Sequence, residues 1–144
     1  MPKVDIIASN AVGLTIKPGS GLYRNGDKIT ASGTELSEIY LNAEILDISG
    51  ANSAHVVCPT AGTLVAVYAV TRDGTPGGAT ALTVTVAGGS TLATLSLGGS
   101  DAAGTVVSDT TLTQAITAGQ DISIASDGGA SSARPVKVSF IVRR

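Results

Sequence analysis

The residues of this chain that could do chemistry are few and stand apart from one another. His55 is the only histidine and Cys58 the only cysteine. On a strand, side chains three positions apart point to opposite faces, so these two residues cannot hold a metal ion between them. A single thiol also excludes an intrachain disulfide, and a zinc site or a catalytic triad needs further partners. We therefore expect structural roles for both residues.

The acidic residues and glycines form no recognisable site either. Asp121 and Asp127 match no calcium-binding spacing, and the Asp-Gly pair at Asp127 is typical of a turn. Asp101 and Asp109 lack the cleft and the aromatic platforms of a glycosidase. No glycine-rich stretch is followed by the Lys and Ser or Thr of a phosphate-binding loop. We expect no enzyme activity, no catalytic residue, no metal and no cofactor.

Composition and charge argue against two classes of partner. The 144-residue chain is only 14% charged and has a formal net charge of -2. Nucleic-acid binding depends on clustered Lys and Arg, and the basic residues here are scattered. The uncharged stretch 74–100 contains three Gly-Gly pairs, whereas a membrane helix needs about 20 mainly apolar residues. We expect no nucleic-acid partner and no membrane segment.

Alternation of apolar with polar residues dominates the chain from residue 55 onwards. Such runs predict strands with one buried face, and turn signals such as Asp73-Gly74 separate them. The run 64–70 is apolar at every position and predicts a central strand that is covered on both faces. Short strands at regular spacing favour a mainly β fold over residues 45–144, a β-sandwich (jelly-roll-like) or a small barrel. The alternating runs are 82–86, 93–97, 122–124 and 136–142.

The first 44 residues are organised differently. Residues 4–8 and 12–16 each predict a short strand, and a loop-rich stretch follows them. Residues 34–46 predict the one helix, which is too short to be stable alone and must dock on something. We therefore predict an N-terminal arm, residues 1–44, that contacts the β domain or a larger partner. The helix rests on apolar residues at three- and four-residue spacing: Leu36, Ile39, Tyr40, Ala43 and Leu46.

Few aromatic side chains are available for a binding surface. Tyr68 and Phe140 fall on predicted strands at core positions, which leaves Tyr23 and Tyr40 as exposed candidates. Sugar-binding modules usually rely on exposed aromatic faces, so this composition argues against such a module.

Ile141 is apolar where a strand facing water would be polar. Either its face is a subunit interface, or a second sheet or the arm covers it.

Two stretches resemble small structural proteins of tailed bacteriophages. The first, KITASGTEL at residues 28–36, is similar to the T-A-x-x-x-E-L/I-N segment of phage decoration and fibre proteins, with Ser37 in place of Asn. The second, residues 48–68, contains CPTAGTLVAVY and is similar to the V-V-x-P-x-A-G-T-I-x-x-V-Y stretch of phage head decoration domains. In that resemblance a strand ends at Pro59, the chain turns at Gly62, and it re-enters as the central strand of a sandwich.

The resemblance implies a capsid decoration (cement) protein, a structural protein that binds the outer surface of the phage head and stabilises the shell. Its partners would be the major capsid protein and further copies of itself, with a homotrimer favoured. It would be assembled in the cytoplasm of the bacterial host and reside on the exterior of the virion. The candidate contacts to the capsid or to other copies are Val4, Ile6, Leu14, Ile16, Tyr23, Tyr40 and Ile141.

Two other functions stay open. The chain could be a glycan- or receptor-binding β-sandwich module on a virion or a cell surface, which saturable binding to a polysaccharide would identify. It could also be a minor component of a head fibre or tail, which a low copy number per particle would identify.

Overall fold

The structure is a computed structural model that describes residues 22–24, 27–29 and 38–144. The chain divides into two units, Met1–Thr34 and Glu35–Arg144. In the first unit, strands β1 (Leu22–Arg24) and β2 (Asp27–Ile29) pair in antiparallel fashion. The strands predicted for residues 4–8 and 12–16 lie outside the described residues, and so do four of the candidate contacts, Val4, Ile6, Leu14 and Ile16.

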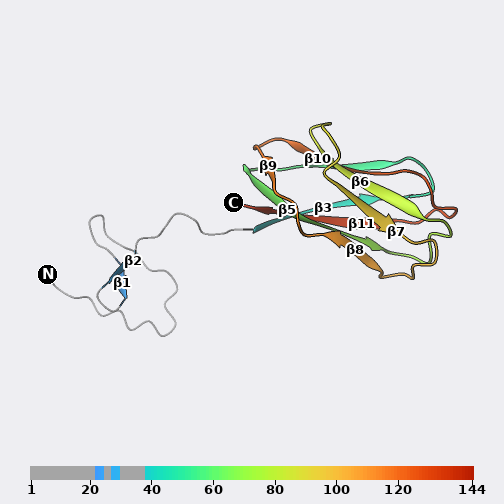
Figure 1. The fold of residues 1–144 in the computed structure, drawn as a ribbon, viewed down its shortest axis with the longest axis horizontal. Coiled ribbons are helices and arrows are strands. Elements are labelled where there is room, and N and C mark those ends of the chain that lie inside the picture. Colours follow the sequence, from blue (N-terminus) through green and yellow to red (C-terminus); the bar gives the residue numbers. More distant parts are fainter. Residues whose placement is uncertain (1–21, 25–26, 30–37) are drawn as a thin grey trace. The chain divides into compact units, whose positions relative to one another are not determined.

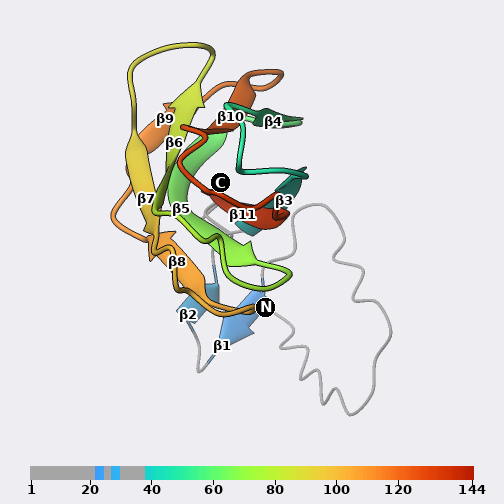
Figure 2. The same cartoon turned by 90° about the vertical axis from the view of Figure 1, so that its right-hand side faces the viewer.

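The second unit is a β-sandwich of two antiparallel sheets (Figure 1). The five-stranded sheet has the order β3-β11-β5-β8, with β9 also paired to β5. The four-stranded sheet has the order β4-β10-β6-β7. Figure 2 shows the two layers. Their strands are β3 (Glu38–Ile45), β4 (Ser53–Val57), β5 (Gly62–Thr71), β6 (Thr80–Val86), β7 (Ala93–Leu97), β8 (Val106–Asp109), β9 (Gln114–Ile116), β10 (Asp121–Ser126) and β11 (Val136–Arg143).

The predicted β-sandwich is confirmed, and its strands form where the sequence alternates. Strand β6 alternates buried and half-buried residues along its whole length, and β7 alternates buried and exposed ones. This period arises because successive side chains of a strand point to opposite faces. The buried side chains of both sheets meet in one core that Phe140 occupies without any exposure. Other large, fully buried members are Ile45, Leu64, Leu82, Leu97, Ile122 and Ile124.

The chain bends between β4 and β5 at residues 59–60, slightly before the Gly62 turn that the phage-like motif implies. Strand β4 ends at Val57, before Pro59, and β5 begins at Gly62. A Cβ atom at Gly62 would lie 2.7 Å from the carbonyl oxygen of Arg143, so only glycine allows this close approach of β5 to β11. Strand β5 then runs between β11 and β8, which confirms that it is central to its sheet. The predicted cover on both of its faces is wrong, because its outward residues Tyr68 and Val70 are only half-buried.

The helix predicted for residues 34–46 is wrong where the structure describes it. Residues 34–37 lie outside the described part, and Glu38–Ile45 forms strand β3, which pairs with β11 along its full length. The same residues also alternate: Ile39, Leu41, Ala43 and Ile45 turn towards the core, and the residues between them turn outwards. Pairing with β11 selects this period over the helical one, because a short isolated helix gains too little to form alone.

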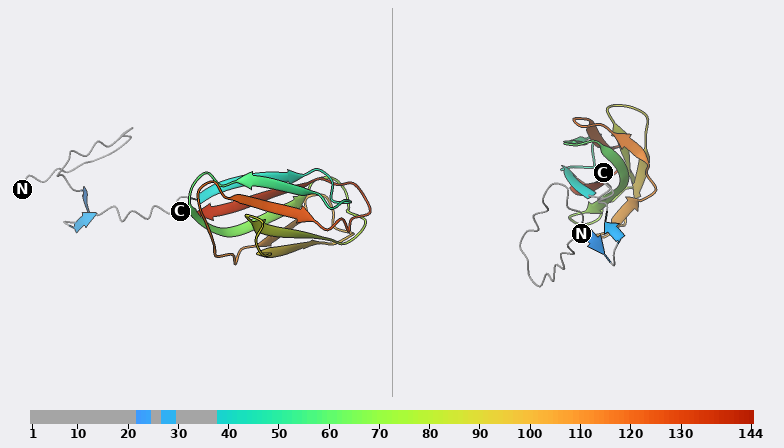
Figure 3. Two further views of the ribbon diagram at one scale, coloured as in Figure 1. Left: turned by 90° about the horizontal axis from the view of Figure 1, so that it is seen from above. Right: turned by 90° about the vertical axis from the view of Figure 1, so that its left-hand side faces the viewer.

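Strand β3 also moves the boundary between the two parts of the chain. The sequence suggested an arm of residues 1–44, but the edge strand Glu38–Ile45 belongs to the sandwich, and the two units separate after Thr34. Figure 3 shows β3 in its layer beside β11. Tyr40 therefore belongs to the β domain and not to the arm.

Candidate functional site

The outward side chains of the five-stranded sheet form a surface that is here named the β3–β8 face. Cross-strand pairing arranges these side chains in rows. One row joins Tyr40, Ile141 and Ala66, and the next contains Asn42, Ser139, Tyr68 and Ser108. A third row contains Glu44, Lys137, Val70 and Val106.

Tyr40 and Ile141 are direct partners in the register of β3 and β11. Two of the predicted contact residues, far apart in the sequence, are thus brought together. Tyr40 is 61% exposed, and Ile141 is half-buried. The neighbouring Phe140 and Val142 face the core, so the second sheet lies on the other side and does not cover Ile141. Of the remaining predicted contacts, Tyr23 lies in β1, in the other unit.

At one end of this face, the carboxylate of Glu38 forms hydrogen bonds with Arg143 and Tyr40. Arg143 donates a hydrogen bond of 2.9 Å to Glu38 Oε1, and the Tyr40 hydroxyl donates one of 3.0 Å to Glu38 Oε2. The hydrogen bond from Arg143, followed by that from Tyr40, lowers the pKa of Glu38 below its ordinary value. The hydrogen bond to the Glu38 carboxylate in turn raises the pKa of Tyr40. The Tyr40 ring is therefore fixed at its hydroxyl end while its face stays exposed.

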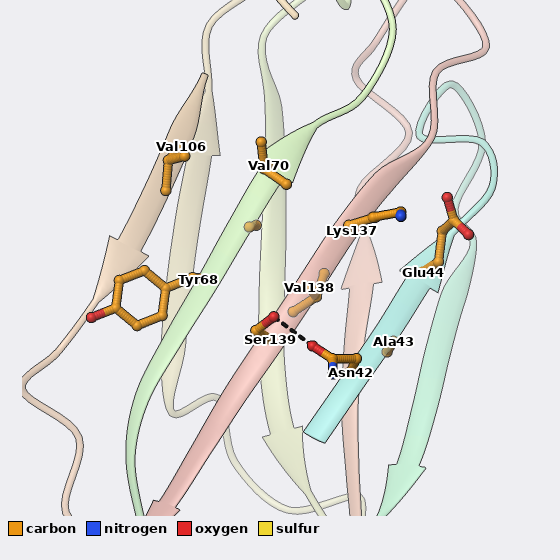
Figure 4. A pocket seen from close by; sticks show the side chains of 10 residues that line it. Asn42, Ala43, Glu44, Tyr68, Val70, Val106, Lys137, Val138 and Ser139 are labelled. Atoms are coloured by element: carbon orange, nitrogen blue, oxygen red, sulfur yellow. Dashed lines mark hydrogen bonds between the residues drawn. The ribbon is translucent and has the colours of Figure 1, made fainter. Parts of the chain in front are cut away.

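A shallow depression of about 660 Å³ lies in the middle of the β3–β8 face (Figure 4). The Tyr68 ring and the Val106 side chain stand on one side of it, and Asn42 and Ser139 on the other. The Ser139 hydroxyl donates a hydrogen bond of 2.6 Å to Asn42 Oδ1. Tyr68 was predicted to be a core residue, and this is wrong: it is half-buried and points outwards, because Val67 and Ala69 occupy the inward positions.

The outward face of the four-stranded sheet is different in kind. Its exposed and half-buried positions on β6, β7 and β10 are filled mostly by hydroxyl side chains. The Thr85 and Ser123 hydroxyls share a hydrogen bond of 2.7 Å across the β6–β10 ladder. The residues of this hydroxyl face are Thr83, Thr85, Thr94, Ser96 and Ser123.

One group of polar side chains at the margin of the hydroxyl face was missed by the sequence reasoning. His55 Nδ1 lies 2.9 Å from Asp121 Oδ2, and His55 Nε2 lies 3.2 Å from Ser53 Oγ. His55 was expected to be structural, yet its side chain is 59% exposed. The missing signal was the pairing of β4 with β10, which brings a carboxylate from 66 positions away beside the ring.

Cys58, Asp127 and Asp109 each make hydrogen bonds to residues close to them in the sequence. Cys58 is fully buried, and its thiol donates to the carbonyl oxygen of Thr60. Asp127 accepts a hydrogen bond from the backbone of Gly129, which confirms the Asp-Gly turn. Asp109 accepts two hydrogen bonds from Thr111, and these lower its pKa.

Two further features, a cluster of metal ligands and a membrane-spanning helix, are absent from the part of the chain that the structure describes. Within residues 22–24, 27–29 and 38–144, no three His, Cys, Asp or Glu side chains come together as metal ligands. The same residues include no helix with the length and apolar character to span a bilayer.

Comparison with known proteins leaves the family of this chain unassigned. No protein-family model matches it, and no curated protein is significantly similar to it. Among solved structures, the chain is similar to CsCBM6-3 from Clostridium stercorarium, a structure described as a complex with cellobiose. The two are 18% identical with a TM-score of 0.43, and the match covers 75% of this chain and 80% of the other.

Proposed function

We propose that this chain is a decoration protein of a tailed-phage head and that its β3–β8 face makes part of its protein contacts. The observation that carries the proposal is the Tyr40–Ile141 pair. A β-sandwich that faced only water would carry polar residues at these outward positions. The phage-like motif supports the same function, since β4 ends before Pro59 and β5 is the central strand that the resemblance implies.

The distribution of charge on the β3–β8 face is that of a protein interface. Interface cores are depleted of charge and enriched in aromatic residues, with a polar rim around them. Here Tyr40, Ile141 and Tyr68 lie in the central rows, and charged groups lie at the ends: Glu38 with Arg143 at one, Glu44 with Lys137 at the other. Full burial of one large apolar side chain contributes about 1.5–3 kcal/mol, so the Tyr40–Ile141 pair alone is a substantial anchor.

The proposed mechanism is stabilisation by mass action. A protein that binds only the mature shell lowers the free energy of that shell and makes it harder to rupture. In a homotrimer, the first contact would make the next two intramolecular, which raises the overall affinity. Contacts from Val4, Ile6, Leu14, Ile16 and Tyr23 would add to those of the face.

Co-sedimentation with undecorated heads assembled from the major capsid protein of its own phage tests this function. We expect saturable binding of the full chain, with several hundred copies per head, in the range that lattice decoration requires. A handful of copies per head would instead identify a fibre or tail component. No binding at micromolar concentration would overturn the proposal.

Glycan binding is the second candidate, and the depression on the β3–β8 face favours it. Tyr68 offers an aromatic side chain beside the hydrogen-bonded pair of Asn42 and Ser139. Ligand sites typically combine such apolar walls with a few polar groups. This candidate predicts saturable retardation of the chain in gels that contain bacterial polysaccharide, weakened by Tyr68→Ala and not by Ser123→Ala. Equal mobility of the chain in gels with and without polysaccharide would exclude glycan binding.

A further inference from the structure

Ser53, His55 and Asp121 form a hydroxyl–imidazole–carboxylate chain on the side of the sandwich away from the β3–β8 face. Each ring nitrogen of His55 has one partner: Nε2 lies 3.2 Å from Ser53 Oγ, and Nδ1 lies 2.9 Å from Asp121 Oδ2. This is the order of groups in which serine hydrolases activate a nucleophile. The carboxylate accepts the Nδ1 proton, which leaves Nε2 free to take the proton of the serine hydroxyl.

The antiparallel ladder between β4 and β10 positions these three side chains. Ser53 and His55 are two positions apart on β4 and therefore point to the same face. Asp121 lies on β10 opposite Val57, the next outward residue of β4, so its carboxylate reaches the ring diagonally. The imidazole has a hydrogen-bond partner at each nitrogen, and these partners come from two paired strands.

The backbone N–H group of Ser53 lies at a sheet edge, next to the hydroxyl of the same residue. Ser126 N bonds Asn52 O at 2.8 Å, and Cys58 N bonds Gln120 O at 2.9 Å. Because hydrogen-bonded pairs alternate along an antiparallel ladder, the N–H groups of Ser53 and His55 point away from β10. Among the described strands β4 pairs only with β10, so these N–H groups lie at an open sheet edge. The N–H of the nucleophilic residue itself is a usual oxyanion donor.

We propose that Ser53 is a nucleophile that accepts acyl groups from small activated esters, with His55 as the general base and Asp121 as its positioning residue. Ser53 Oγ attacks the ester carbonyl carbon while its proton passes to His55 Nε2. The C–O bond to the leaving group then breaks, and His55 returns the proton to the departing oxygen. Water attacks the acyl-serine in the same way, which releases the carboxylic acid and restores Ser53 and neutral His55.

The solvent exposure of the three side chains determines which substrates are expected. Ser53 and His55 are exposed, and the Asp121 side chain is 37% exposed, so water competes for each hydrogen bond. Electrostatic stabilisation of a transition state is weaker in water than in a closed cleft. Esters with good leaving groups need the least stabilisation, and they are therefore the expected substrates rather than amides.

The test uses a fluorophosphonate probe, which phosphonylates an activated serine as fluoride leaves, and p-nitrophenyl acetate as the ester. We expect the full chain to gain one probe per molecule, mapped to Ser53 by mass spectrometry, and to release p-nitrophenol faster than buffer does. Ser53→Ala abolishes both. His55→Ala slows labelling about 100-fold, the ordinary contribution of a general base. Asp121→Asn slows it less, and it leaves Ser53 as the labelled residue.

Ser123→Ala is the matched control, because Ser123 lies opposite His55 in the ladder and bonds Thr85 instead. It should label at the wild-type rate. Circular dichroism melts check that each variant is folded, which we expect because all these side chains reach solvent. Labelling of Ser53→Ala or His55→Ala at the wild-type rate would overturn the proposal. Labelling of the folded chain no faster than in denaturant would overturn it too.

Discussion

The two outward faces of the sandwich share one core and one period, but they carry different side chains. The β3–β8 face has Tyr40, Ile141 and Tyr68 at its centre and charges at its ends. The opposite face is lined mostly with small hydroxyl residues such as Thr85 and Ser123, and Val57 is exposed on its edge strand β4. Hydroxyl groups remain solvated, whereas an exposed tyrosine and isoleucine gain free energy when a partner covers them. The comparison therefore favours the β3–β8 face over the opposite face as the proposed protein-binding surface.

The largest predicted effect is a difference in stability between a truncated core residue and a truncated residue of the β3–β8 face. Phe140→Ala should lower the free energy of unfolding by about 3–5 kcal/mol, because it removes a fully buried ring and leaves a cavity. Its neighbour Ile141 is half-buried on the outward face, and Ile141→Ala should cost less than about 1.5 kcal/mol. Urea unfolding measures both values. Equal losses would mean that Ile141 belongs to the core and that the β3–β8 face is covered.

A smaller effect is predicted on the hydroxyl face. The double variant Thr85→Val with Ser123→Val removes both partners of one hydrogen bond, so no unpaired group remains. Such replacements are nearly neutral, and we expect a change below about 1 kcal/mol in urea unfolding. Head binding should also be unchanged. Loss of head binding in this variant would show that the hydroxyl face, and not the β3–β8 face, contacts the head.

The smallest predicted effect is a change in the melting temperature at acidic pH. The pKa of Glu38 is lowered by its hydrogen bonds from Arg143 and Tyr40, so their stabilisation is complete above the ordinary value of 4.5 and is lost as the pH falls through the lowered value. Glu38→Gln lacks this dependence. The melting temperature of the wild type should therefore fall slightly more steeply than that of the variant below pH 4.5. Because the pair is exposed, the difference is small, and parallel curves would show that the network does not hold Tyr40.

The strands could be predicted from the sequence wherever one period dominated. The run 136–142 fits only the strand period, broken at Ile141 alone, and forms β11, whereas residues 38–45 satisfy a helical and a strand period at once. Only the partner strand β11 decides between them, and a single sequence does not show which strands pair. The same limit hid the contact between His55 and Asp121. Tyr68 was misplaced because every residue of its run is apolar, so alternation does not mark the inward side.

The central claim is that the β3–β8 face binds protein, and a matched pair of charge substitutions tests it most directly. Ile141→Lys places a cation at the centre of this face, and Ser96→Lys places one at an exposed position of the hydroxyl face. The measurement is the dissociation constant of each variant for undecorated heads. We predict that Ile141→Lys weakens binding by about tenfold or more and that Ser96→Lys leaves it within about twofold. Equal effects, or a larger effect of Ser96→Lys, would contradict the account.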